Sequence, residues 1–201
     1  MYEAEKQVGV TSTYYFRFST IDNKLIKDMI MDHFNVGLHF ETIADYIAES
    51  GCNNKYDINM DEMRMRFKKD IERFEKETGV KVRSVCSHGH ELNQKLGISN
   101  NAITEDQDLS EYGIIFEAYE REMYENDVDC HIMDAHLHKN FGFSYKDNPY
   151  DAIEIGYQNI VFLSHPHNWY MPLKSRIRSL KAIIVGKASY SSEKTFNRIA
   201  K

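Results

Sequence analysis

The sequence predicts an α/β protein built on a parallel sheet or an α/β barrel. Short apolar runs, about six in number, alternate with stretches of helical periodicity, and parallel neighbouring strands need such helical crossovers. Clusters rich in His, Asp and Glu directly follow several of these runs. In barrels and open parallel sheets, ligands and catalytic groups gather at the carboxyl ends of the strands. We therefore expect these scattered side chains to converge at one edge.

The periodicity predicts each element in turn. Strands are expected at 13–18, 36–40, 80–86, 112–116, 128–133 and 160–163, and helices at 2–8, 22–34, 59–78 and 173–185. The pattern is strongest in 59–78, where Met63, Phe67 and Phe74 recur at three- and four-residue spacing before Gly79 ends the helix. In 22–34, Ile26, Met29, Ile30 and His33 are predicted to share one face.

Composition limits the class of protein. The 201 residues are expected to form one domain, 1–201, with a net charge of -6 and no basic block, which argues against nucleic-acid binding. No apolar run would span a bilayer, and the first ten residues do not resemble a signal peptide. Three widely spaced cysteines suggest a reducing compartment, with Cys86 and Cys130 buried in strands. We predict a cytoplasmic location.

Two His-containing clusters are candidates for metal ligation. His39 and Glu41 lie two residues apart at the end of one predicted strand, so both point to the same face of an extended segment. His88 and His90 repeat this spacing around a glycine. Imidazole and carboxylate both suit zinc. The alternatives are a buried His39 bonded to backbone and a polar turn with exposed His88 and His90.

A third cluster, residues 129–138, holds three His and two Asp. Asp134, His136 and His138 would share a strand face and are similar to the His-x-His metal motif of the amidohydrolase superfamily. In that superfamily the motif follows the first strand of a much longer barrel, whereas few residues follow His138 here. An exposed His-rich loop is the other reading.

The last predicted strand leads into S-H-P-H-N-W, residues 164–169. The proline after His165 holds that residue extended and fixes the direction of its side chain, which suits a general acid. Trp169, the only tryptophan, is placed to line a pocket.

These segments, in order, resemble the polysaccharide deacetylase superfamily, in particular its branch among surface-polysaccharide biosynthesis proteins. The resemblance covers most of the chain and rests on Y-F-R (15–17), G-L-H (37–39), S-H-G (87–89), D-A (134–135) and L-S-H-P-H-N-W (163–169). It implies a distorted (β/α) barrel. Members of the superfamily remove N- or O-acetyl groups from sugars with a divalent metal, usually zinc.

By resemblance, the functional residues fall into three groups. His165 and Asp134 are the catalytic candidates, with His165 protonating the leaving group. The metal ligands would be His39, His88 and Glu41, because the family's second ligand His corresponds to Ile43 here. The residues predicted to contact substrate are Arg17, His90 and Trp169. An acylated sugar is the expected substrate.

The family opens with a strand that carries two aspartates, and this sequence matches the pattern only after that point. We therefore expect a barrel lacking the first strand, N-terminally incomplete, and a protein that is weakly active or inactive as a metal-dependent deacetylase. The alternatives are a non-catalytic carbohydrate- or metal-binding member and an amidohydrolase-like hydrolase using Asp134, His136 and His138. An open sheet edge would favour a homodimer.

Overall fold

A computed structural model describes residues 1–134 and 149–166 of the chain. The chain divides into two compact units, Met1–Arg121 and Glu122–Lys201. Each unit contains its own set of paired parallel strands. Within the described ranges, no helix has the length and apolar character needed to cross a membrane. A single domain over the whole chain stays a prediction.

The first unit is built on an open four-stranded parallel sheet. Its strands, in the spatial order β1-β2-β3-β4, are β1 (Thr13–Phe16), β2 (Asn35–Phe40), β3 (Ser84–Ser87) and β4 (Phe116–Glu117). The parallel α/β class is thus confirmed. The predicted barrel is not confirmed, because the sheet is not closed among the described residues.

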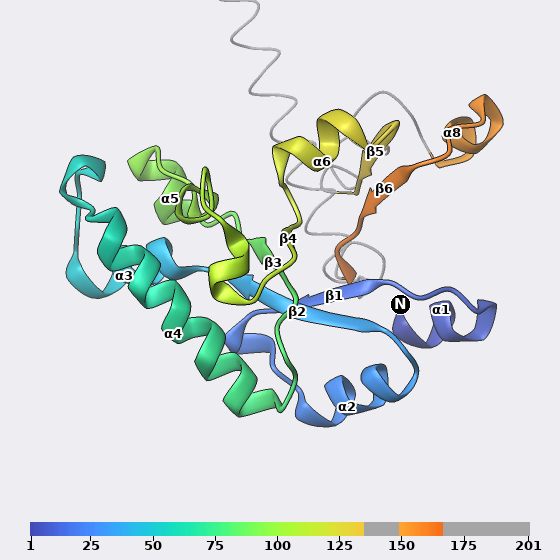
Figure 1. Ribbon diagram of the computed structural model, residues 1–201, viewed down its shortest axis with the longest axis horizontal. Coiled ribbons are helices and arrows are strands. Elements are labelled where there is room, and N and C mark those ends of the chain that lie inside the picture. The colour runs from blue at the N-terminus through green and yellow to red at the C-terminus, as the bar shows by residue number, and fades with distance from the viewer. Residues whose placement is uncertain (135–148, 167–201) are drawn as a thin grey trace, which may run out of the picture. The chain divides into compact units, whose positions relative to one another are not determined.

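Helix α1 (Tyr2–Val8) precedes β1, and helices connect each strand of the first unit to the next. The connecting helices are α2 (Asn23–Met31), α3 (Thr42–Ser50), α4 (Met60–Thr78) and α5 (Glu91–Leu96), with 3-10 turns η1 (Phe18–Thr20), η2 (Lys55–Asp57), η3 (Asn100–Ile103) and η4 (Leu109–Tyr112). Both α2 and α4 pack against β2 and against each other, so they cover the same face of the sheet (Figure 1).

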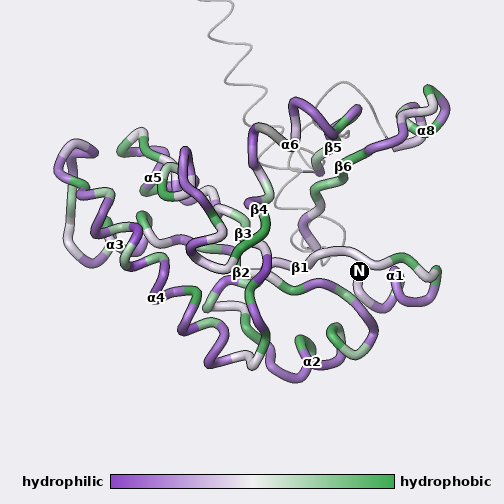
Figure 2. Tube along the Cα trace, viewed as in Figure 1, coloured by the Kyte–Doolittle hydropathy of each residue, from purple (hydrophilic) through white to green (hydrophobic). Residues whose placement is uncertain are grey.

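Helix α4 forms where the periodicity predicts it. Asn59 caps its start by accepting hydrogen bonds from two backbone N–H groups of the first turn, and Gly79 ends it in the left-handed conformation at φ 72°. The helix is largely hydrophilic (Figure 2), and its buried positions form one apolar stripe. These positions include Met63, Phe67 and Phe74. Burial of this stripe, rather than helix propensity alone, stabilises α4.

The core of the first unit lies between β2 and this helical layer. Leu38 is fully buried, and the rings of Phe40 and Phe67 lie 4.7 Å apart. From α2, Ile26 and Met29 enter the same core, whereas Ile30, predicted to share their face, is exposed. His33, also predicted there, is exposed beyond the end of α2 with φ 66°.

Five predicted strands have different bounds in the structure: the one predicted at 36–40 begins at Asn35, the one predicted at 128–133 begins only at Cys130, and three others differ as follows. The strand predicted at 112–116 is wrong for most of its length, because η4 occupies Leu109–Tyr112 and β4 begins only at Phe116. Asp108 caps η4, and Gly113 ends it at φ 73°. The strand predicted at 13–18 stops at Phe16, where η1 follows after Arg17, and the one predicted at 80–86 begins only at Ser84.

The described part of the second unit contains a parallel strand pair. The elements described in this unit are α6 (Arg121–Asn126), β5 (Cys130–Met133), α8 (Pro149–Ile155) and β6 (Ile160–Leu163). Helix α6 runs across the boundary between the units. Cys130, Ile132 and Ala152 form its small core. The predicted burial of Cys86 and Cys130 is confirmed. The helix predicted at 173–185 lies outside the described residues.

Candidate functional site

Polar side chains gather where the strands of the first unit end. Arg17 directly follows β1, Glu41 follows β2 and His88 follows β3. The three strands are parallel and adjacent, so their carboxyl ends reach the same edge of the sheet. The backbone N–H of His88 donates to the carbonyl of Phe40 at 3.0 Å, which continues the strand pairing up to this edge.

Glu41 lies at the centre of this group. Its Oε2 accepts a hydrogen bond from Nε of Arg17 at 2.7 Å, and its Oε1 lies 2.8 Å from Nδ1 of His88. The contact between Glu41 and His88 is within ion-pair distance, but it does not have the geometry of a hydrogen bond. The Glu41 side chain is only 13% exposed, so pairing with Arg17 offsets much of the cost of burying its charge.

His39 lies in β2 beside this group. Its register partner on β3 is Cys86, and Nδ1 of His39 lies 3.0 Å from the carbonyl oxygen of Cys86. Because a carbonyl only accepts, Nδ1 carries the proton and Nε2 is the unprotonated nitrogen of the neutral ring. The His39 and His88 rings meet edge to face with centroids 4.9 Å apart.

Burial keeps both imidazoles neutral near physiological pH. Desolvation lowers the pKa of His39 to about 4, and the hydrogen bond to Cys86 opposes only part of that effect. Desolvation also lowers the pKa of His88, against the opposing charge of Glu41. Neutral imidazole is the form that ligates metals and accepts protons.

The predicted metal ligands only partly fit a zinc ion. His39 has the anchored Nδ1 that zinc-bound imidazoles commonly show. Glu41, however, is held by Arg17. Among residues 1–134 and 149–166, no group of three or more His, Cys, Asp or Glu side chains could hold a metal ion. The metal role of His39, Glu41 and His88 stays a prediction.

His90 has a structural contact that the sequence analysis did not foresee. Its Nδ1 accepts a hydrogen bond from the backbone N–H of Leu92 at 3.1 Å and so caps α5. Its ring centroid is 6.2 Å from that of His88. The predicted substrate contacts of His90 and Arg17 stay predictions.

The second unit holds a buried carboxylate paired with an imidazole. Asp134 directly follows β5 and is fully buried, and His165 follows β6 two residues beyond its end. Oδ1 of Asp134 lies 2.6 Å from Nδ1 of His165. Oδ2 accepts the backbone N–H of His165 at 2.7 Å and the hydroxyl of Ser164 at 3.3 Å. One carboxylate thus holds the whole turn after β6.

This pairing fixes the chemistry open to His165. With Nδ1 donating to Asp134, the second ring nitrogen, Nε2, is the proton-exchanging atom. A buried carboxylate in this position orients the ring and fixes its tautomer. The arrangement can therefore carry a general acid or base.

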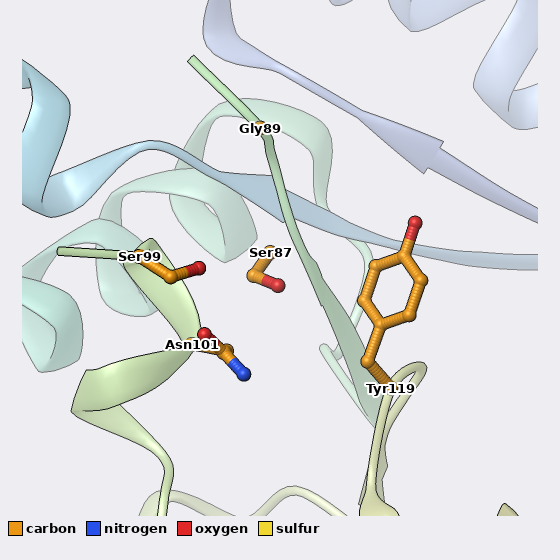
Figure 3. Close-up of a pocket in the computed structure, with 5 residues that line it drawn as sticks. All are labelled: Ser87, Gly89, Ser99, Asn101 and Tyr119. Atoms are coloured by element: carbon orange, nitrogen blue, oxygen red, sulfur yellow. The ribbon is translucent and has the colours of Figure 1, made fainter. Parts of the chain in front are cut away.

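A pocket of about 320 Å³ lies in the first unit at the end of β3 (Figure 3). Its lining comprises Ser87, Gly89, Ser99, Asn101 and Tyr119. Figure 3 shows Ser87 between Ser99 and Asn101 on one side and the ring of Tyr119 on the other. Sequence reasoning missed Ser99, Asn101 and Tyr119, because single polar residues outside a recognisable motif give no signal.

Three predicted site residues, His136, His138 and Trp169, lie outside the described residues. The remaining ones fall into two groups. Arg17, His39, Glu41 and His88 come together in the first unit, with His90 next to them, and Asp134 pairs with His165 in the second. Convergence of both groups at one edge stays a prediction.

The fold and these contacts define an α/β protein with polar clusters after parallel strands. No family model matches the sequence, and no curated protein does. Among solved structures, it is similar to a mutant of a CE4 family pseudoenzyme and to a mutant of a CE4 family pseudoenzyme with restored enzymatic activity. In each, the identity is 14%, the TM-score is 0.42, and the match covers 90% of this chain and 56% of the other. The chain thus spans little more than half the length of these proteins.

Proposed function

We propose that this chain is a deacetylase-like protein that hydrolyses acyl groups on sugars, with His165 as its proton-transfer residue. The observation that supports this most strongly is the 2.6 Å contact between His165 and the fully buried carboxylate of Asp134. A carboxylate buried at that position would be costly if it served packing alone. The sugar substrate follows from the sequence resemblance.

One imidazole can carry out both proton transfers of the hydrolysis. Nε2 of neutral His165 takes a proton from a water molecule as the water oxygen bonds to the acyl carbon. The same proton then passes to the sugar oxygen or nitrogen as the bond from the acyl carbon to that atom breaks. The products are acetate and a free hydroxyl or amine. Asp134 stabilises the imidazolium in between.

A zinc ion would polarise the acyl carbonyl and acidify a bound water. The described ligands only partly fit that ion, so no step is assigned to it. With proton transfer by His165 alone, we expect slow hydrolysis.

The second candidate is a non-catalytic carbohydrate-binding protein. The Arg17–Glu41 ion pair favours it, because it engages the carboxylate that the predicted metal site would use beside His39 and His88. In this case the strand-end side chains serve recognition and folding rather than hydrolysis.

Acetate release from an acetylated chitooligosaccharide separates the two candidates. The proposal expects slow turnover by the full chain, a loss of about 10²–10⁴-fold in His165→Ala, and a smaller loss in Asp134→Asn. The matched control is His33→Asn, which alters an exposed imidazole and keeps a residue type that tolerates positive φ. Equal rates in the control and in His165→Ala, or no release by the unmodified chain, would leave only the binding function.

A further inference from the structure

We infer that the pocket lined by Ser87, Asn101 and Tyr119 binds one neutral sugar ring. This inference takes the sugar class from the proposed function and adds a binding site that the sequence analysis did not assign. The pocket volume, about 320 Å³, is near the lower end of small-ligand sites, about 300–1,000 Å³. It suits a single ring rather than a long chain.

Two buried polar side chains fix the walls of this pocket. On one wall, Glu117 is 4% exposed, and its two oxygens accept the backbone N–H groups of Ser87 at 2.8 Å and Tyr119 at 2.6 Å. Glu117 thereby sets the separation of the end of β3 from the segment after β4. A buried carboxylate satisfied in this way holds both segments rigidly.

Asn100 fixes the opposite wall. It is fully buried, its Oδ1 accepts the N–H groups of Ile43 and Ala44, and its Nδ2 donates to the carbonyl of His88 at 2.6 Å. Ser99 and Asn101 flank it in the chain and line the pocket. A preorganised wall loses less conformational entropy when a ligand binds.

The lining matches a neutral polyol. The described lining residues offer hydroxyls, an amide that both donates and accepts, and one aromatic ring, and none of these described residues carries a charged side chain. Within the described part of the chain, the amide of Asn101 makes no side-chain hydrogen bond to protein, so it is available to a ligand. The carboxylate of Glu117 behind the wall disfavours an anion.

The test is an NMR titration of the ¹⁵N-labelled full chain with N,N′-diacetylchitobiose, with glucuronate as the anionic comparison. The inference expects saturable shifts of the Gly89 and Asn101 amides with the neutral sugar and weaker binding of glucuronate. Asn101→Ala and Ser99→Ala should each weaken binding by about 3- to 10-fold, which corresponds to one lost hydrogen bond. The exposed Asn53→Ala is the matched control.

Non-saturable shifts, equal affinity for glucuronate, or unchanged affinity in both pocket variants would overturn the inference. Ser99 is exposed, so Ser99→Ala keeps the test valid if Asn101→Ala unfolds. Sugar binding is measured on the unmodified chain, independently of acetate release. Failure of the hydrolytic proposal therefore appears as missing acetate release with sugar binding intact, whereas failure of this inference appears as missing binding.

Discussion

His39 illustrates how burial sets the behaviour of a single residue. Its folded pKa of about 4 lies below the ordinary value of 6.5 because desolvation disfavours the charged ring. Between these pH values the unfolded chain binds more protons than the folded chain, so the free energy of unfolding falls as the pH falls. The contribution of His39 to the free energy of unfolding is fully present above pH 6.5 and is lost as the pH falls towards 4.

Replacing His39 should therefore flatten the pH dependence of stability. The shift corresponds to about 3 kcal/mol at full effect, and residual solvent exposure reduces it. His39→Asn, which keeps a donor near the Cys86 carbonyl, should lose less stability between pH 6.5 and 4 than the unmodified chain does. Urea unfolding at several pH values measures this, with His33→Asn as the control. The same decline in His39→Asn and the unmodified chain would refute the assignment.

The sequence could predict some site contacts at the residue scale but not others. Glu41 and His88 could be anticipated together, because each lies just after a predicted strand and parallel strands end at one edge, whereas Arg17 was placed inside the predicted strand 13–18. The ion pair between Arg17 and Glu41 could not be predicted, because it depends on how the chain turns after each of the two strands. The same holds for His90, which caps a helix through its ring.

At the scale of elements, Gly37 allows β2 to pack closely against both β1 and β3. A Cβ at this position would lie 2.5 Å from the carbonyl oxygen of Ser84 and 2.7 Å from the ring of Tyr15. The Ser84 oxygen belongs to the backbone of β3 and cannot move without disturbing the sheet. The glycine is therefore required by close approach rather than by a turn.

Gly37→Ala should destabilise the protein by about 1–3 kcal/mol through overpacking. The matched control is Gly89→Ala, whose Cβ would meet nothing within 4 Å and should change stability by at most about 0.5 kcal/mol. Urea denaturation followed by circular dichroism measures both. Equal unfolding midpoints for the two variants would contradict the packing argument.

Helices and strands differed in how well the sequence predicted them. The bounds of α1 and β6 were predicted correctly and those of α4 to within one residue, and in both helices a capping Asn or Gly coincides with an end. The helix predicted at 22–34 was three residues too long at its end, and strands β1, β3, β4 and β5 were predicted too long or displaced. Their ends depend on where a neighbouring strand offers hydrogen bonds, and turn signals such as Asp108 and Gly113 matter more than apolar content.

At the scale of the whole molecule, the parallel class was predictable and the closure of the sheet was not. Alternation of strands and helices requires parallel neighbours, and every strand pair in the described residues is parallel. Closure into a barrel depends on the tilt and number of strands, which apolar runs do not encode. The site likewise combines local clusters that sequence order alone does not place together.

The most direct test of the hydrolytic proposal is a double-mutant cycle on acetate release by the full chain. If Asp134 acts through His165, adding Asp134→Asn to His165→Ala should cost almost nothing beyond the loss caused by His165→Ala alone. Losses that simply multiply, so that Asp134→Asn has the same effect with and without His165, would contradict the account.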